Sequence, residues 1–293
     1  MTPFLDRLAA GEILVGDGAI GSLLIAHGLQ PGDCPDEVGL DAPEVLETIA
    51  RDYLGAGSQL LTTNTFGASP LKLADYELAE RTEDINRAAV EALQKVAAGD
   101  AYVSGSCGPC GKILEPYGDT AEDAVFDSFA RQMKALAGVD VVCVETMSDL
   151  REAVLAVRAA KEALPGTPVM ATMTFDPTPR GFFTIMGNSV AAVCSGLADA
   201  GADVVGSNCG NGIDRMVEIA RAFGEATRLP ILIQSNAGQP AMEAGRVVYS
   251  ESPEMFADRA PALIDAGARI IGGCCGTTPA HIRALHDAVA ARS

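Results

Sequence analysis

The sequence predicts a (β/α)8 barrel, and three observations lead to that fold class. Eight short apolar runs occur along the 293 residues, a helical pattern follows each run, and similar glycine-containing segments join several helices to the next run. Barrels of this class commonly occupy about 250 residues as one unit. We therefore expect one domain over residues 1–293, with its site at the carboxyl ends of the strands. A doubly wound open sheet is the alternative.

The apolar runs are the expected strands. Their apolar character is nearly continuous rather than alternating, which is typical of parallel strands that are buried on both faces. In chain order the runs are Ile13–Val15, Gln59–Thr62, Ala101–Ser104, Val139–Val144, Val169–Met173, Asp203–Gly206, Ile231–Gln234 and Arg269–Ile271.

The segments between the runs have helical periodicity. Apolar residues recur three and four positions apart in the sets Leu150, Val154, Val157; Met216, Ile219, Ala220, Phe223; and Phe256, Ala260, Leu263, Ile264. Several of these segments then end at a glycine, the residue that best adopts the left-handed cap at which a helix stops. The similar junctions are 54–58 (LGAGS), 197–203 (LADAGAD), 263–269 (LIDAGAR) and, more loosely, 137–140 (AGVD).

The composition excludes several classes of partner. The formal net charge is −18, which repels phosphate backbones and anionic lipid headgroups, so we expect neither nucleic acid nor a membrane surface as a partner. Residues 1–12 resemble neither a signal peptide nor an anchor, and no apolar stretch approaches the ~20 residues of a membrane span. We expect a cytoplasmic protein, in which clustered cysteines are more typical of ligands or nucleophiles than of disulfides.

Polar side chains gather at the expected strand ends. In a barrel these positions line one face, where the site lies. The strand bodies are apolar, so the polar ends predict a site above a packed interior. The residues at these ends are Asp17, Asn64, Cys107, Glu145, Asn208, Cys209, Asn236, Cys274 and Cys275.

Three of the cysteines are candidate metal ligands. Cys209 follows the sixth expected strand and Cys274 and Cys275 follow the eighth, and these two ends lie near each other in a barrel. Adjacent residues of a regular strand face opposite ways, but Gly272, Gly273 and Gly276 would give the backbone enough freedom for both sulfurs to turn inward. Three thiolates leave one open position on a tetrahedral zinc ion, which is typical of a catalytic site. The alternative is that these thiols only pack the core.

The ligand set also bears on the chemistry. A zinc ion that already carries three thiolates is a poor Lewis acid for water, but it can bind a fourth thiol and lower the pKa of that thiol below neutrality. The sulfur stays electron-rich and can attack an activated methyl group. The cysteines therefore favour alkylation of a thiol over hydrolysis.

At these residues the sequence resembles the homocysteine S-methyltransferase family, which includes the homocysteine module of cobalamin-dependent methionine synthase and the enzymes that use betaine or S-methylmethionine. The resemblance covers essentially the whole chain. It lies in residues 16–22 (GDGAIGS), 62–66 (TTNTF), 145–146 (ET), 206–209 (GSNC), 236–240 (NAGQP) and 272–277 (GGCCGT). It implies a homocysteine-binding barrel and transfer of a methyl group to homocysteine to give methionine.

The resemblance also implies roles for single residues. Cys209, Cys274 and Cys275 would hold one Zn²⁺ per chain, and Asn236 would occupy the fourth position when substrate is absent. Asp17 and Glu145 would bind the homocysteine ammonium. The main alternative for these carboxylates is a helix cap. Backbone N–H groups of Gly18 and Ala19 would bind the substrate carboxylate. We also expect Asn64 and Asn208 to line the substrate site, although Asn64 is equally suited to a hydrogen bond within its loop.

The methyl donor stays open at this point. The chain contains no Trp, the best aromatic face for a quaternary ammonium group, so betaine is disfavoured. S-methylmethionine or a methylated corrinoid protein remains, and because no cobalamin-binding module follows the barrel, cobalamin would come only with a separate partner protein. Alternatives are another small thiol as acceptor, a corrinoid partner in a demethylation pathway, another zinc enzyme such as a hydrolase, and a zinc/thiol redox or metal-sensing binding protein.

The remaining cysteines and the histidines are not expected in the site. Cys107 and Cys110 form a C-x-x-C motif that departs from the family pattern, and we interpret them as loop thiols, with a second metal or redox function as the alternative. Cys34, Cys143 and Cys194 are interpreted as incidental. The histidines lie on expected helices or at their ends, which predicts surface positions for His27, His281 and His286.

Overall fold

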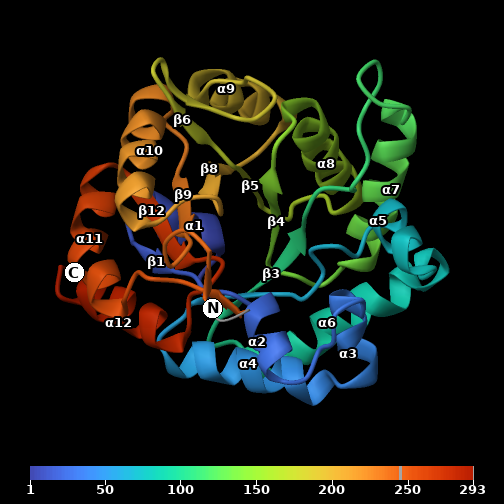
Figure 1. Cartoon of the computed structure of the whole chain (residues 1–293), viewed down its shortest axis with the longest axis horizontal. Coiled ribbons are helices and arrows are strands. Elements are labelled where there is room, and N and C mark those ends of the chain that lie inside the picture. Colours follow the sequence, from blue (N-terminus) through green and yellow to red (C-terminus); the bar gives the residue numbers. More distant parts are fainter. Residues whose placement is uncertain (244–245, 293) are drawn as a thin grey trace.

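The computed structural model describes residues 1–243 and 246–292. Eight parallel strands form one sheet in the order β1-β12-β9-β8-β5-β4-β3-β2, and helices form a ring around them (Figure 1). The strands are β1 (Leu14–Val15), β2 (Leu60–Thr62), β3 (Tyr102–Cys107), β4 (Val141–Met147), β5 (Val169–Met173), β8 (Val204–Asn208), β9 (Ile231–Ser235) and β12 (Ala268–Gly273).

The first and last strands of this order nearly close the sheet into a barrel. The N–H of Gln59, just before β2, donates to the Val15 carbonyl of β1 at 2.7 Å, and the Val15 N–H donates to the side-chain Oε1 of Gln59 at 3.1 Å. The side-chain bond replaces a ladder bond at a seam where only two residues of β1 are in strand geometry. The predicted barrel is therefore confirmed, and the open-sheet alternative is wrong.

A long helix follows each barrel strand, as the sequence predicts. The helices are α4 (Pro43–Gly55), α6 (Thr82–Ala97), α7 (Glu122–Ala135), α8 (Leu150–Ala163), α9 (Val190–Ala200), α10 (Ile213–Ala226), α11 (Pro253–Asp265) and α12 (Pro279–Ala290). The glycines of the similar junctions adopt the left-handed conformation, with φ of 98° at Gly57, 100° at Gly138, 103° at Gly201 and 104° at Gly267.

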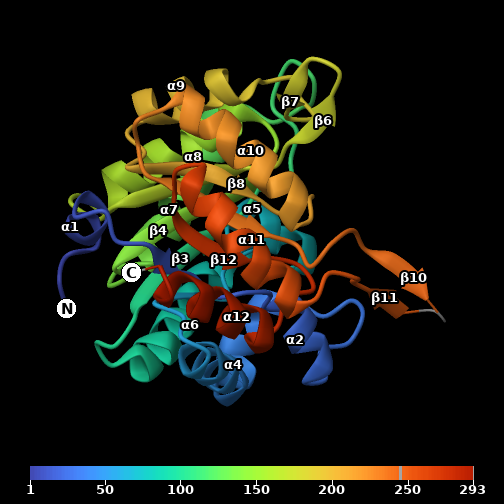
Figure 2. The same ribbon diagram turned by 90° about the vertical axis from the view of Figure 1, so that its left-hand side faces the viewer.

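Short elements lie in the segments that connect strands to helices. Two hairpins leave the barrel on the same side (Figure 2): β6 (Asp176–Thr178) pairs with β7 (Gly181–Phe183), and β10 (Ala241–Glu243) pairs with β11 (Arg246–Val248). The other short elements are α2 (Gly21–Ala26), α3 (Val38–Asp41), α5 (Pro70–Leu73) and the 3₁₀ turns η1 (Pro35–Glu37), η2 (Ala74–Tyr76) and η3 (Ala79–Arg81). These connections surround the carboxyl ends of the strands, where a barrel site is expected.

The opposite end of the barrel is closed by the N-terminal helix α1 (Phe4–Ala9). Phe4 and Leu8 are buried against the barrel interior, and the Phe4 ring packs edge-on against Tyr102 with ring centroids 5.4 Å apart. Apolar side chains from every barrel strand fill this interior, namely Leu14, Leu60, Tyr102, Val141, Cys143, Met170, Val204, Leu232 and Ile270. The polar side chains expected in the site belong to the other end, where the strands finish. Within the described residues, no helix is long and apolar enough to cross a membrane.

Candidate metal and substrate site

Three cysteine sulfurs lie together at the carboxyl ends of the strands. Cys209 directly follows β8, Cys274 and Cys275 directly follow β12, and β9 lies between these two strands in the sheet. The three sulfur atoms all lie within 4.8 Å of one another, and those of Cys209 and Cys275 are 3.8 Å apart. The barrel thus brings together the thiols that the sequence singles out, across more than sixty residues of chain.

Backbone hydrogen bonds to β9 hold both cysteine segments. The Cys209 N–H donates to the Gln234 carbonyl at 3.1 Å, and the Cys274 N–H donates to the Ser235 carbonyl at 2.7 Å. Cys209 itself has a φ of 59°, a left-handed conformation that is uncommon outside glycine and that typically occurs at functional sites.

The glycines around the cysteine pair act differently from the expectation. Only Gly276, with a φ of 79°, needs the conformational freedom of glycine. Gly273 is required for space instead, because a Cβ atom there would lie 2.2 Å from the hydroxyl oxygen of Thr277. A Cβ atom at Gly272 would lie 3.0 Å from the Asp17 carbonyl oxygen. Close packing against Asp17 and Thr277 therefore restricts the backbone that carries the pair.

The donor set fits a zinc ion. Zn–S bonds of about 2.3 Å in a tetrahedron place sulfurs about 3.8 Å apart, which matches the separation of Cys209 and Cys275. Hydrogen bonds from Cys209 and Cys274 lower the pKa of Cys275 to about 3, whereas contacts with Cys209 and Cys275, together with burial, raise the pKa of Cys274. The cluster thus already favours one negative charge. The nearby Asn236 Oδ1 is buried and has no hydrogen-bond partner among the described residues.

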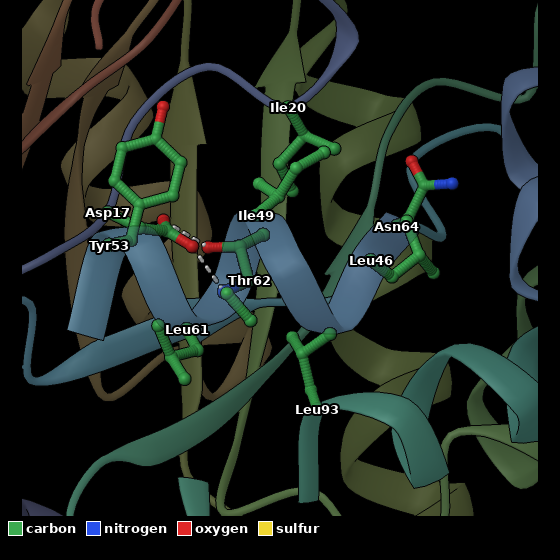
Figure 3. Close-up of a pocket in the computed structure, with 10 residues that line it drawn as sticks. Asp17, Ile20, Leu46, Ile49, Tyr53, Leu61, Thr62, Asn64 and Leu93 are labelled. Atoms are coloured by element: carbon green, nitrogen blue, oxygen red, sulfur yellow. Dashed lines mark hydrogen bonds between the residues drawn. The ribbon is translucent and has the colours of Figure 1, made fainter. Parts of the chain in front are cut away.

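Asp17 lies in the segment after β1 and is buried, with 3% of its surface exposed. Its carboxylate accepts hydrogen bonds from the Thr62 N–H at 2.6 Å and from the Thr62 hydroxyl at 2.8 Å, as Figure 3 shows. Burial raises the pKa of Asp17 to about 6 in spite of these bonds. Its partners belong to a strand rather than a helix start, so Asp17 is not a helix cap.

Glu145 lies in β4 and is partly buried. Its Oε1 accepts a hydrogen bond from the Ser106 hydroxyl at 2.6 Å, and its Oε2 accepts one from Asn208 Nδ2 at 3.2 Å. Burial raises the pKa of Glu145 to about 7, the Ser106 hydrogen bond opposes this, and the charge of Asp17 adds to it. The charge of Asp17 acts on Glu145, so a cation bound near both carboxylates would lower both pKa values.

Asn208 links the acidic pair to the sulfur cluster. Its Oδ1 accepts hydrogen bonds from the Thr146 N–H at 2.7 Å and from the Thr172 hydroxyl at 2.8 Å, which fixes the orientation of the amide. Its Nδ2 therefore faces Glu145 and also lies 4.0 Å from the sulfur of Cys274. Asn208 thus contacts both the Glu145 carboxylate and one sulfur of the cluster.

Three other predicted residues lie close to Asp17. Asn64 lines the pocket of Figure 3 at the far side from Tyr53. Its Nδ2 donates to the carbonyl of Pro35, which lies in the connection after β1, at 2.6 Å, so the bond joins two loops. The Ala19 N–H donates to the Thr277 hydroxyl at 3.1 Å, so this donor is already used. At Gly18 a Cβ atom would lie 2.5 Å from that hydroxyl, so only glycine fits.

Sequence reasoning missed several residues that orient the site. Ser106 and Thr62 hold the two carboxylates, and Thr146 orients Asn208. For Ser106 a signal was available: extending the third strand to Cys107 makes alternate residues face the barrel interior. The Thr146 contact was not predictable, because it depends on a φ of 59° at that residue and on irregular pairing of β4 with β5.

Cys107 and Cys110 are buried outside the site. The Cys107 sulfur lies 3.3 Å from Gln132 Oε1 of α7, and the Cys110 N–H donates to Glu152 Oε1 of α8 at 2.8 Å. Both belong to the core between strands and helices, and burial raises the pKa of each thiol. Cys107 thus does not face the site, although it ends a barrel strand.

One histidine departs from the expected surface position. His27 is exposed as predicted and His286 is partly buried, but His281 is buried. Its Nε2 lies 3.0 Å from the Glu251 carbonyl oxygen, and its Nδ1 contacts Thr278 in the capping box of α12. The surface prediction for His281 is wrong because this ring caps its own helix and packs on Phe256.

Fold and site together define a (β/α)8-barrel protein in which three thiols and two hydrogen-bonded carboxylates lie at the carboxyl ends of the strands. A family model described as homocysteine S-methyltransferase matches residues 14–289. The chain therefore belongs to the homocysteine S-methyltransferase family. This confirms the resemblance on which the sequence-based roles depend.

Individual relatives agree with this assignment. Methionine synthase of Mycobacterium tuberculosis is 33% identical over 99% of this chain, and this chain spans only 25% of that relative. Betaine–homocysteine S-methyltransferase 1 of Rattus norvegicus is 30% identical over 98% of this chain and 74% of its own. The crystal structure of the homocysteine methyltransferase MmuM from Escherichia coli in its metallated form superposes with a TM-score of 0.80, at 26% identity and full coverage of both chains.

Proposed function

We propose that this protein is a zinc-dependent S-methyltransferase that transfers a methyl group to the thiolate of homocysteine and so forms methionine. One observation carries the proposal: Asn208 lies between the carboxylate of Glu145 and the sulfur cluster of Cys209, Cys274 and Cys275. Homocysteine is a small molecule with an ammonium group at one end and a thiol at the other, and it fits this order of groups.

Cys209, Cys274 and Cys275 would hold the zinc ion. Their spacing, their sulfur donors and the pKa of Cys275, lowered to about 3, support this assignment. The buried Oδ1 of Asn236, which has no partner among the described residues, supports Asn236 as a weak ligand that an incoming thiolate displaces. Bound there, zinc supplies a positive charge that lowers the pKa of the incoming thiol and keeps its sulfur nucleophilic at neutral pH.

Asp17 and Glu145 would bind the substrate ammonium. Both carboxylates are held in the cleft by hydroxyl and amide donors, and both ionise more readily when a cation enters. Gly18 allows the chain to approach closely, and its N–H is our candidate donor to the substrate carboxylate. In the transfer itself, the substrate sulfur forms a bond to the methyl carbon as the donor–methyl bond breaks, and the thiol proton has already left to solvent.

The donor is either S-methylmethionine or a methylated corrinoid protein. Among the relatives, this chain covers a quarter of methionine synthase and all of MmuM, so both a multi-part and a single-barrel arrangement occur in the family. If the donor is the methylated corrinoid protein, that protein would bring the cobalamin. Betaine is disfavoured because the chain has no Trp for a cage around a quaternary ammonium group.

The decisive experiment measures methionine formation. Zinc-loaded protein and homocysteine are incubated in turn with S-methylmethionine, betaine and a methylated corrinoid protein, and the Cys274→Ser variant serves as the matched inactive protein. We expect methionine with S-methylmethionine or the corrinoid protein, and none with Cys274→Ser. Zinc binding without turnover of any donor would instead indicate a redox or metal-sensing protein, and product only with a different thiol would replace homocysteine as the acceptor.

A further inference from the structure

Glu251 binds to all three parts of the chain that carry the candidate metal ligands. It lies between β11 and α11 and is partly buried. The candidate ligands follow three different strands, β8, β9 and β12, and they are Cys209, Asn236, Cys274 and Cys275. The carboxylate, the backbone N–H and the backbone carbonyl of Glu251 each bind a residue that follows a different one of these strands. One residue outside the sulfur cluster thus connects the segments that form it.

The carboxylate of Glu251 caps the helix that follows Cys209. The N–H of Ile213, the first residue of α10, donates to Glu251 Oε2 at 2.8 Å. The N-cap residue is Gly212, which has no side chain to bind the free N–H groups of this helix end, and a carboxylate is stabilised there by those groups and by the helix dipole. A Cβ atom at Gly212 would lie 2.0 Å from Glu251 Oε1. The carboxylate therefore fills the space that the glycine leaves.

The backbone N–H of Glu251 binds the segment after β9. It donates to the Ala237 carbonyl at 2.9 Å, and the Ala237 N–H in turn donates to the Cys275 carbonyl at 2.9 Å. Ala237 directly follows Asn236, whose own N–H donates to the Asn211 carbonyl at 3.0 Å. The segment that carries the buried Asn236 amide is thus held between Glu251 and the second cysteine segment.

The backbone carbonyl of Glu251 contacts the helix after the cysteine pair through His281. The His281 Nε2 lies 3.0 Å from this carbonyl oxygen, and because a carbonyl only accepts, Nε2 carries the ring proton. Nδ1 is then the acceptor for the Thr278 N–H at 3.2 Å, in the capping box of α12. The ring also packs edge-on against Phe256 of α11, with ring centroids 5.0 Å apart. The imidazole therefore fixes the Glu251 backbone to the start of α12.

We propose that Glu251 is a positioning residue for the metal site, which holds Cys209 at the distance from Cys275 at which both sulfurs reach one ion. It does so by capping α10 with its carboxylate while its backbone is fixed to Ala237 and His281. The inference rests on the proposed function, in which the three sulfurs bind zinc. Residues that orient metal ligands without binding the ion typically contribute about 10-fold to 100-fold to metal affinity.

The zinc affinity of Glu251 variants tests this role. Dissociation constants are measured by competition with a chromophoric chelator, and Co²⁺ is titrated into the metal-free proteins. We expect Glu251→Ala to bind zinc about 10-fold to 100-fold more weakly than wild type, and its Co²⁺ complex to absorb more weakly in the visible, because these bands are intense only in tetrahedral ligation. Glu251→Gln keeps an oxygen that can accept the Ile213 N–H. It should stay within about fivefold of wild type, since it loses only the interaction of the charge with the helix dipole.

Two further variants make the result specific. Gly212→Ala displaces the carboxylate from the other side of the contact. The backbone φ of Gly212 is −78°, which any residue adopts, and the three atoms nearest to a new Cβ form the carboxyl group of Glu251, so the fold should tolerate the change. We expect the same loss of zinc affinity as in Glu251→Ala, and this variant decides the inference if Glu251→Ala does not fold. Glu225→Gln, at an exposed position near the end of α10, should bind zinc as wild type does.

The possible outcomes separate this role from the proposed function. Wild-type zinc affinity and a wild-type Co²⁺ spectrum in Glu251→Ala and Gly212→Ala would overturn the role, even if urea unfolding showed a loss of stability, because the contact would then serve only the fold. An equal loss of affinity in Glu225→Gln would overturn it too. Methionine formation is measured on the zinc-loaded wild type. Zinc binding without methionine would overturn the proposed function alone, whereas no zinc binding by wild type would overturn both.

Discussion

At the scale of single residues, ionisation of the two carboxylates of the site has opposite effects on protein stability and on substrate binding. Asp17 and Glu145 are buried enough that their pKa values rise to about 6 and about 7, so their ionised forms destabilise the substrate-free protein at neutral pH. A bound ammonium needs those ionised forms. Removing either charge should therefore weaken substrate binding and stabilise the substrate-free protein.

Glu145→Gln should weaken homocysteine binding while leaving zinc in place. Glutamine can still accept a hydrogen bond from Asn208 and donate to the Ser106 hydroxyl, so the cleft keeps its shape. Loss of one buried charge partner costs about 2–4 kcal/mol, or about 30-fold to 1,000-fold in affinity. Calorimetric titration of zinc-loaded protein measures this, with Glu91→Gln on the exposed face of α6 as control. Equal affinity of Glu145→Gln and wild type would remove Glu145 from the substrate pocket.

The same substitution should raise stability in a pH-dependent way. In the unfolded chain Glu145 ionises near its usual pKa of 4.5, whereas in the folded protein it ionises at about 7. Between these values the folded protein binds more protons, so its free energy of unfolding falls as pH rises through this window. Substrate-free Glu145→Gln lacks this loss and should exceed wild type by about 1–3 kcal/mol at pH 8, with little difference at pH 5. Thermal unfolding at both pH values provides the measurement, and a constant difference would contradict the raised pKa.

The sequence predicts the position of a site residue along its strand, but it does not predict the hydrogen bonds of that residue to other side chains. Strand ends can be read from apolar runs, so Asp17, Glu145 and the three cysteines were placed at one barrel face. The hydrogen bonds from Thr62, Ser106 and Asn208 depend on side-chain conformation and pairing register, which no local pattern encodes. Asn64 is an example. From the sequence its amide could hydrogen-bond to the substrate or to a loop, and in the structure it donates to the Pro35 carbonyl.

At the scale of elements, buried strands could be predicted from the sequence because they appear as apolar runs, whereas the exposed strands of the hairpins could not. All eight barrel strands match an apolar run, although β4 continues three residues beyond its predicted end, through Glu145 and an irregularity, to Met147. The hairpins β6–β7 and β10–β11 were not predicted. β6 is exposed throughout and contains Pro177, so neither apolar periodicity nor strand propensity marks it. Its pairing with β7 depends on the turn between them.

Close contact between β8 and β9 should make Gly206 irreplaceable. A Cβ atom there would lie 1.8 Å from the Leu232 carbonyl oxygen, which belongs to the neighbouring strand. Gly206→Ala must push the two strands apart just before Cys209, and we expect a loss of about 3 kcal/mol or more together with weaker zinc binding. Gly21→Ala is the matched control, because nothing lies within 4 Å of a Cβ at this helix start, and it should be neutral or slightly stabilising. Unfolding by urea compares the two variants.

At the scale of the whole molecule, the apolar core and the polar candidate site lie at opposite ends of the barrel axis. Apolar side chains from all eight strands and from α1 fill one end, so the polar groups at the other end sit on a rigid base. The sulfur ligands come from β8 and β12, which are joined only through β9 in the sheet. A bound ion would therefore connect segments far apart in the chain, and it would bind the folded protein more tightly than the unfolded chain, in which the three sulfurs are not held together.

Zinc should consequently raise the thermal stability of the entire barrel. At a free zinc concentration 100 times the dissociation constant, mass action adds about 2.7 kcal/mol, and for a domain of this size that corresponds to a rise in Tm of about 4 °C. Mg²⁺ should produce no rise, because thiolates bind it poorly. Scanning calorimetry of metal-free protein with each ion measures the effect. Cys274→Ser, which removes one sulfur of the cluster, should lose most of the rise, whereas Cys34→Ser, which changes a buried cysteine outside the cluster, should keep it. A rise of equal size in Cys274→Ser would place the zinc somewhere else on the molecule. No rise in wild type would contradict zinc binding by the three cysteines.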